Sequence, residues 1–390
     1  MLRIECPRHG ALLNHNHGSE TADGLTIMLR GKCTQPGEVL VNGIAAKRQG
    51  EDFTCEVTLT EKVNVIRAEI DGKYGESCQQ IKVLWDKASF KRYNFFIDDH
   101  SFFLTDIAKD RPSSLFDHFY LKGLQDIHRR YGTKFTLNCF YRNDHHGFEM
   151  KDFPDTYKGE WIDNSDWLRL SFHAYSEFPD RPYTSSDPTK LLSDYDLLKS
   201  EITRFAGAET FIEPVVVHWA VTSREGVKAL VDKGYANVFT GGFRGNFALW
   251  QAEIDAGRDP MVSLKDYDWT APTDIGYYLT LEEALYLYAR KAWMDFSTGA
   301  LFYGTSRCLC NANTQEQIRV NLAKTFALAE PFGFETYKLA SHEQYSFKYY
   351  KNYVPDHWER MDLACRICTE NGAKPVFFAE GLLGNKAWDM

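Results

Sequence analysis

The chain has 390 residues, 44% of them hydrophobic, and its formal net charge of −9 comes from acidic and basic residues interspersed along the sequence. This composition is that of a globular protein with room for two or three domains, and the lack of a basic block argues against nucleic acid or an anionic membrane as partner. The nine cysteines are scattered along the chain, which predicts reduced thiols. No run approaches the ~20 apolar residues of a membrane span, and no apolar stretch follows Met1. Together these features predict a cytoplasmic protein.

Residues from about Gly24 to Lys87 alternate apolar and polar side chains over short runs that Gly, Pro and Asn interrupt, which is typical of β structure. Strands are predicted at 26–29, 38–41, 53–59, 63–70 and 79–84, with tight turns at Asn42-Gly43 and Asp71-Gly72. The pattern resembles the small immunoglobulin-like modules that accompany many bacterial carbohydrate-active enzymes, and this resemblance implies a module without catalytic residues. We expect residues 1–88 to form a separate immunoglobulin-like β-sandwich.

After Lys87 the pattern changes from strands alone to strands that alternate with helices. Strands are predicted at 92–100, 133–141, 167–175, 211–219, 236–240, 300–303, 335–340 and 374–378, and helices at 114–131, 191–205, 224–232, 281–293, 315–328 and 357–369. This number of strand–helix units in ~300 residues is expected of a TIM-like (β/α) barrel, complete or distorted, over residues 89–390. An open doubly wound sheet is the alternative, although no Gly-rich phosphate loop follows any strand.

Chemically active side chains gather where the predicted strands end. The first strand ends in Asp98, Asp99 and His100, and two adjacent carboxylates resist ionising together unless a cation or an acid lies close. Four later strands lead into His173 with Glu177, His218 with Trp219, His342 with Glu343, and Glu380. Because the carboxyl ends of barrel strands share one face, these residues predict a metal or acid–base site there.

Other residues near this face form a candidate substrate-binding surface. The rings of Tyr183 and Trp219 are suited to stacking on sugar faces, with packing inside the barrel as the alternative role. Arg244 carries a charge that can hold an anionic substrate group. Polar groups for substrate binding are also offered by His100, His218 and Glu380.

The Asp98-Asp99 pair and His173 resemble, distantly, the polysaccharide deacetylase (carbohydrate esterase) superfamily. In that family the first Asp is the general base, the second binds a divalent metal, a His-x-x-x-His motif completes the metal site, and a later His is the general acid. The resemblance implies Asp98 as base and Asp99 and His173 as metal ligands. It implies His342 as acid, and Glu343 beside it is a further catalytic candidate.

Glu177 stands where the second His of that motif belongs. A carboxylate can ligate zinc, manganese or iron, and Glu177 lies one helical turn beyond His173 if the chain coils there. The Phe178-Pro179 pair favours an extended chain instead, which turns Glu177 away and makes His342 the third ligand. His218 as the missing ligand, or a site without metal, are further alternatives.

The resemblance implies a metal-dependent hydrolase that removes an acyl group from an amino sugar or a related carbohydrate amide. The expected cofactor is a divalent ion, zinc first, with manganese, iron, cobalt and nickel as alternatives. The expected partner is a carbohydrate, not nucleic acid or a membrane. Two other functions stay open: a glycoside hydrolase, or a carbohydrate-binding protein without catalysis. The glycoside hydrolase would pair carboxylates drawn from Asp98, Asp99, Glu177, Glu343 and Glu380.

Overall fold

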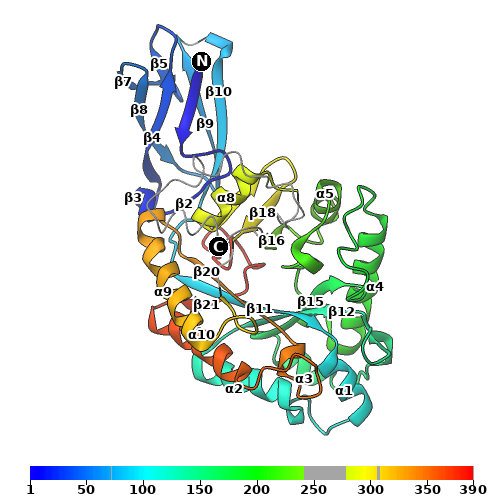
Figure 1. The fold of residues 1–390 in the computed structure, drawn as a ribbon. Helices are drawn as coiled ribbons and strands as arrows, with labels where there is room; N and C mark the ends of the chain where they lie inside the picture. The colour runs from blue at the N-terminus through cyan, green and yellow to red at the C-terminus, as the bar shows by residue number, and fades with distance from the viewer. Residues whose placement is uncertain (72, 241–277, 305–307, 390) are drawn as a thin grey trace.

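The computed structural model describes residues 1–71, 73–240, 278–304 and 308–389. An N-terminal β module stands at one end of a larger α/β part, and the C-terminal residues return to the region where the two meet (Figure 1). No helix in these ranges is both long enough and apolar enough to cross a membrane.

Two five-stranded sheets make up the N-terminal module. One contains β1 (Leu2–Cys6), β4 (Leu25–Cys33), β8 (Asp52–Leu59) and β7 (Lys47–Gln49), with β3 (Gly18–Glu20) beside β4; the other contains β2 (Leu12–Leu13), β10 (Lys73–Trp85), β9 (Val63–Ile70), β5 (Val39–Val41) and β6 (Ile44–Ala45). Alternate residues such as Leu25, Ile27 and Leu29 of β4 point inward, and both sheets contribute to one apolar core. The five predicted strands are present, and the immunoglobulin-like identity of the module stays a prediction.

The larger part is built on a six-stranded parallel sheet. Its order is β15 (Leu168–Ala174), β12 (Phe135–Phe140), β11 (Arg92–His100), β20 (Thr336–His342) and β19 (Cys308–Leu309), with β21 (Lys374–Pro375) on β11. A three-stranded sheet holds β16 (Val238–Thr240), β18 (Ala300–Tyr303) and β17 (Ala292–Asp295), and a hairpin holds β13 (Arg142–Asn143) and β14 (Phe148–Glu149). Every residue of β11 is buried, as expected of a strand covered on both faces.

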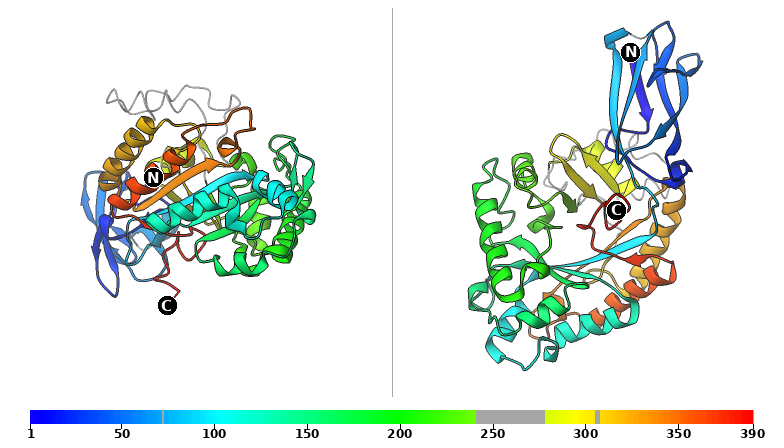
Figure 2. Two further views of the ribbon diagram at one scale, coloured as in Figure 1. Left: turned by 90° about the horizontal axis from the view of Figure 1, so that it is seen from below. Right: turned by 180° about the vertical axis from the view of Figure 1, so that it is seen from behind.

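Helices lie along the outside of the six-stranded sheet, with α4 and α5 toward one edge and α9 and α10 toward the other (Figures 1 and 2). These helices are α1 (Phe102–Asp110), α2 (Phe119–Tyr131), α3 (Lys158–Asp163), α4 (Thr189–Ala206), α5 (Arg224–Asp232), α9 (Gln315–Phe332) and α10 (His357–Glu370). Helix α8 (Leu281–Arg290) instead lies beside the three-stranded sheet, where it contacts β17 (Figure 1). All six predicted helices are present, and Gly132 ends α2 in the left-handed conformation as its position predicts. Together these elements confirm a mixed α/β fold.

The sheet does not close into a barrel within the described residues. The predicted strand at 211–219 is an irregular extended segment that makes only isolated backbone bonds to β15 and β16. Pro214 lies in the middle of this segment and has no N–H to donate to a strand neighbour. Pro375 likewise lies in the last predicted strand, where β21 ends after two residues. Each proline therefore removes one backbone donor where the predicted strand is absent or short.

A buried ion pair ties the linker between the two parts to the C-terminal segment. Arg92, the first residue of β11, is fully buried and donates to Asp86 Oδ2 at 2.8 Å. Asn385 Nδ2 donates to the other oxygen of Asp86, also at 2.8 Å. Trp388 packs edge-on against Trp85 at the same junction. A domain boundary at residue 88, as proposed from the sequence, would therefore separate Arg92 from its counter-ion.

We expect Asp86→Asn to lower the free energy of unfolding by about 3–5 kcal/mol, because it leaves the Arg92 guanidinium buried without a counter-charge. Asp232→Asn is the control, since Asp232 pairs with Lys228 in solvent and an exposed pair contributes about 0–1 kcal/mol. Urea unfolding of the wild type and the two variants measures both effects. Equal losses in the two variants would contradict the role assigned to the buried pair.

Candidate metal and catalytic site

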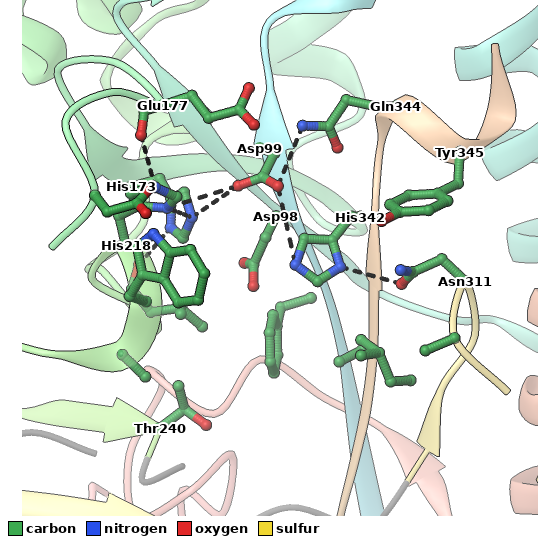
Figure 3. A pocket seen from close by; sticks show the side chains of 18 of the residues that line it. Asp98, Asp99, His173, Glu177, His218, Thr240, Asn311, His342, Gln344 and Tyr345 are labelled. Atoms are coloured by element: carbon green, nitrogen blue, oxygen red, sulfur yellow. Dashed lines mark hydrogen bonds and ion pairs between the residues drawn. The ribbon is translucent and has the colours of Figure 1, made fainter. Parts of the chain in front are cut away.

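A cavity of about 690 Å³ opens where β11, β15 and β20 end (Figure 3). Side chains from segments far apart in the sequence line it. The polar ones include Asp98, Asp99, His173, Glu177, His218, Asn311, His342 and Gln344. The structure thus brings most of the predicted catalytic and metal-binding residues to one place.

Asp98 and Asp99 both line this cavity although they are neighbours in one strand. Successive strand residues normally point to opposite faces of a sheet. Here Asp99 has a left-handed backbone with φ 67°, and the pairing of β11 with β12 shifts between Ile97 and His100. Aspartate adopts this conformation more readily than most residues, and such strain gathers at functional sites. The irregularity lets two adjacent carboxylates serve one site.

Asp99, His173 and His218 form a compact cluster in which three potential ligand atoms face one another. Asp99 Oδ1 lies 3.2 Å from His173 Nε2 and 3.7 Å from His218 Nδ1, and the two ring nitrogens are 3.0 Å apart. His173 belongs to the end of β15, and His218 begins the short 3-10 helix η5 (His218–Ala220) after the irregular segment. Elsewhere in the described ranges no three metal-binding side chains come as close.

Backbone carbonyls determine which nitrogen of each imidazole carries the proton. His173 Nδ1 donates to Val216 O at 2.8 Å, and His218 Nε2 donates to Glu177 O at 3.1 Å. In the neutral rings the two facing nitrogens, His173 Nε2 and His218 Nδ1, therefore carry lone pairs. Burial lowers the pKa of His218 to about 3, which keeps that ring neutral. Metal-binding histidines have this arrangement, with the second nitrogen held by an acceptor.

The cluster fits a divalent metal ion. Burial lowers the pKa of His173, but Asp98 and Asp99 outweigh burial and raise it. Two lone pairs and a carboxylate oxygen repel one another at such short range unless a metal ion, or a proton on His173 Nε2, lies between them. Their separations of 3.0, 3.2 and 3.7 Å bracket the roughly 3.3–3.5 Å expected between ligands of one tetrahedral ion. Asp99 Oδ1 is also buried without a hydrogen-bond donor. One carboxylate and two imidazoles suit zinc, and also manganese, iron, cobalt and nickel.

The two carboxylates of the pair lie in different electrostatic environments. Burial alone raises the pKa of Asp99, but the three imidazoles of the site outweigh burial and hold it well below its usual value. Burial also raises the pKa of Asp98, and there the imidazoles do not reverse the rise. Asn138 Nδ2 orients Asp98 by donating to its Oδ1 at 2.6 Å. Neighbouring carboxyl groups whose pKa values move apart are suited to different tasks, one as a fixed charge and one as a proton acceptor.

His342 lies on the other side of Asp99 at the end of β20. Its Nδ1 donates to Asn311 Oδ1 at 3.1 Å, and its Nε2 lies 3.9 Å from Asp99 Oδ2. Gln344 Nε2 donates to the same Asp99 oxygen at 3.2 Å. In the pairing of β11 with β20, His342 stands opposite Asp98. The imidazole is therefore close to both carboxylates (Figure 3).

Glu177 does not join the metal cluster. Its side-chain Oε2 lies 2.6 Å from His145 Nε2, and only its backbone carbonyl contacts His218. No helical turn follows β15, in agreement with the bias of the Phe178-Pro179 pair toward extended chain. The extended chain predicted as one of two geometries is observed, but His342, which that geometry made the third ligand, lies outside the compact cluster. His218, a further alternative from the sequence, stands in the cluster instead.

No family model matches this chain, and no curated protein matches it. Solved structures do match. The catalytic domain of the peptidoglycan N-acetylglucosamine deacetylase from Eubacterium rectale is 13% identical, with 75% of this chain and 92% of that chain covered at a TM-score of 0.33. The Xyl-CE4 domain of a multidomain xylanase from the hindgut metagenome of Trinervitermes trinervoides is 11% identical, with 76% and 94% covered at 0.33. A polysaccharide deacetylase from Bacillus cereus is 9% identical, with 73% and 90% covered at 0.31.

The resemblance to deacetylase structures is distant.

Three predicted substrate-binding residues lie away from the cavity. His100 is buried beside α2, where its Nε2 forms a hydrogen bond with Tyr120 OH at 2.9 Å. Tyr183 is also buried, and its OH donates to a carboxylate of α4 at 2.9 Å. Glu380 pairs with Arg169, near the start of β15, because the chain leaves the sheet early after β21. Their roles in this structure are in packing and ion pairing.

Glu343 is fully buried and caps helix α1 instead of facing the cavity. Its carboxylate accepts hydrogen bonds from the backbone N–H groups of Ser101, Phe102 and Phe103 at 2.7, 2.8 and 2.6 Å. These groups have no partner within the helix, and the helix dipole favours a negative charge beside them. Burial raises the pKa of Glu343 to about 8, and the three donors oppose this rise. The structure thus replaces the predicted catalytic role of Glu343 with a capping role.

We expect Glu343→Ala to lower the free energy of unfolding by about 3–5 kcal/mol, because three buried N–H groups lose their acceptor. Asp187→Ala is the matched control, since the exposed Asp187 carboxylate accepts from the backbone N–H of Thr189, the first residue of α4, and an exposed bond of this kind contributes about 1 kcal/mol. Urea unfolding followed by circular dichroism compares the two. If Glu343→Ala were no less stable than the control, the capping role would be wrong.

The sequence did not predict the three amide side chains that form hydrogen bonds with Asp98, Asp99 and His342. Asn138 is the single amide side chain in the apolar strand β12, Gln344 follows His342 by two residues, and Asn311 follows the two-residue strand β19. Of these three, only Asn138 differs visibly from its neighbours in the sequence, because it is an amide within an apolar strand. Of the remaining predicted substrate-binding residues, Trp219 lines the cavity and Arg244 lies outside the described residues.

Proposed function

We propose that the protein is a metal-dependent hydrolase that removes an acyl group from an amino sugar or a related carbohydrate amide. The proposal is carried by the convergence of Asp99 Oδ1, His173 Nε2 and His218 Nδ1 in the cavity that also holds Asp98 and His342. We assign a divalent ion, zinc first, to those three atoms. When bound, such an ion polarises a carbonyl group and lowers the pKa of water.

Asp98 is the proposed general base. Asn138 holds one of its oxygens, and burial raises its pKa, so that it accepts a proton more readily than an exposed aspartate does. It takes the proton of the water that attacks the carbonyl carbon of the substrate.

His342 is the proposed general acid. Asn311 accepts the hydrogen bond from its Nδ1 and fixes the ring, which leaves Nε2 on the side of Asp99. His342 gives a proton to the nitrogen of the leaving amine as the C–N bond breaks. The products are then a free carboxylic acid and an amino sugar.

The lining of the cavity is suited to a carbohydrate. Phe178, Trp219, Tyr345 and Tyr350 place aromatic rings around the polar groups. Such rings bury the apolar C–H face of a sugar while its hydroxyl groups reach polar side chains. Of the five carboxylates named for a glycoside hydrolase, Glu343 caps α1 and Glu380 pairs with Arg169, which leaves Asp98, Asp99 and Glu177 in the cavity.

The test is an assay of protein purified without chelator on N-acetylated amino-sugar oligomers, read by mass spectrometry. We expect acetyl groups to be lost from chains of unchanged length, and we expect a chelator to stop the reaction and added zinc to restore it. Shortened chains would indicate a glycoside hydrolase instead. No change in any acylated sugar after metal loading would contradict the proposal.

A further inference from the structure

A second cavity, of about 210 Å³, lies beside the catalytic one. Aromatic and polar side chains line it, and we call it the aromatic cleft: Phe102, His145, His146, Tyr349, Tyr350 and Lys351. Tyr350 lines both cavities. The two cavities therefore share a side chain in their walls, and neither the metal cluster nor the proton-transfer groups line the aromatic cleft.

Tyr349 forms a fixed aromatic surface in the cleft. Its ring stacks on Phe102, with 5.8 Å between centroids and 15° between planes, and its OH donates to Asp106 Oδ2 at 3.1 Å. Phe102 itself is buried, whereas 54% of Tyr349 is exposed. The Tyr349 ring is thus held at its face and at its hydroxyl group but is open to solvent. Because the ring is already ordered, a ligand that stacks on it loses little side-chain entropy on binding.

Aromatic rings connect this surface to the catalytic cavity. Tyr345 lies next to His342 in the cavity and contacts Tyr350, with ring centroids 5.5 Å apart. Tyr350 contacts His145 at 6.2 Å, and His146 contacts Tyr349 edge-on at 5.3 Å. The path runs from the proposed general acid to the exposed Tyr349 without leaving the two cavities.

The polar groups of the cleft are of the kind that binds hydroxyl groups. Lys351 and His146 are exposed at its rim, and His145 is held by the Glu177 carboxylate that lines the catalytic cavity. The aromatic faces and the polar rim match the two surfaces of a sugar ring, one of C–H groups and one of hydroxyl groups.

We propose that the aromatic cleft binds a second sugar residue of an oligosaccharide whose reacting residue occupies the catalytic cavity. The inference rests on the proposed function and extends it: the substrate is a chain of at least a few sugar residues, not a free monosaccharide. The Glu177–His145 pair, at the boundary of the two cavities, then positions the link between neighbouring residues.

The test compares kcat/KM for an N-acetylated tetrasaccharide with that for the monosaccharide. We expect the wild type to favour the tetrasaccharide, and Tyr349→Ala to reduce this preference about tenfold because the stacking surface is lost. Tyr349→Phe keeps the ring and should keep most of the preference. Phe119→Ala is the matched control, because Phe119 is similarly exposed, at 47%, and lines neither cavity.

Calorimetric binding of the already deacylated tetrasaccharide separates this inference from the proposed function. If no acylated sugar reacts but Tyr349→Ala binds the tetrasaccharide about tenfold more weakly than Phe119→Ala does, the cleft is a sugar site and the proposed reaction is wrong. If the wild type shows no preference for length, or Tyr349→Ala retains it, the inference is overturned. The absence of binding by the wild type also overturns it.

Discussion

Asp98→Asn is expected to lower kcat for deacylation by about 10³-fold while the protein keeps its metal. The asparagine retains the oxygen that accepts from Asn138, so the side chain stays in place. What it loses is the capacity to accept a proton from the attacking water, and this function is matched to the raised pKa of Asp98. Steady-state kinetics with metal analysis of the same sample gives both quantities.

Asn138→Ala is the companion variant for this prediction. It removes only the group that orients Asp98, and we expect a smaller loss of kcat, about tenfold, with unchanged metal content. If Asp98→Asn lost its metal, Asp98 would be a ligand and the division of roles within the Asp98-Asp99 pair would be wrong.

Asp99→Asn and His218→Ala are each expected to weaken zinc binding by at least about 100-fold. Each change removes one of the three converging ligand atoms, and the two remaining atoms hold an ion poorly. Competition with a chromophoric chelator measures the affinity directly. Circular dichroism before the titration shows that each variant is folded.

Glu177→Gln is the matched control for the metal prediction. Its carboxylate contacts His145, and the backbone carbonyl that orients His218 is unaffected by the substitution. We expect its zinc affinity to stay within about threefold of the wild type. If Glu177→Gln lost zinc and His218→Ala kept it, Glu177 and not His218 would be the third ligand, as one of the geometries predicted from the sequence has it.

The sequence predicted the mixed α/β fold and the end of β11 because those features depend on local patterns. A strand that is buried on both faces shows as a continuous apolar run, and in β11 that run stops at Asp98-Asp99. The helices α4, α5 and α10 likewise follow from apolar spacing along a short stretch of chain. Such features require no knowledge of distant residues.

The remaining features depend on contacts between distant segments. The position of Glu343 next to His342 predicts a catalytic role, and only the structure shows that the N-terminus of α1 lies against its carboxylate. The ligand role proposed for His218 depends on Glu177 O, 41 residues earlier in the sequence, which accepts a hydrogen bond from its other nitrogen. Pro214 prevents a regular strand before His218, yet the chain still reaches the cluster.

Anomalous X-ray diffraction from crystals of the zinc-loaded protein, recorded on both sides of the zinc edge, tests the central claim most directly. The account predicts one strong peak about 2.0–2.2 Å from Asp99 Oδ1, His173 Nε2 and His218 Nδ1, with Asp98 and Glu177 outside the first coordination sphere. A peak bound by Glu177 or Asp98 instead of His218, or no peak in this cavity from protein saturated with zinc, would contradict it.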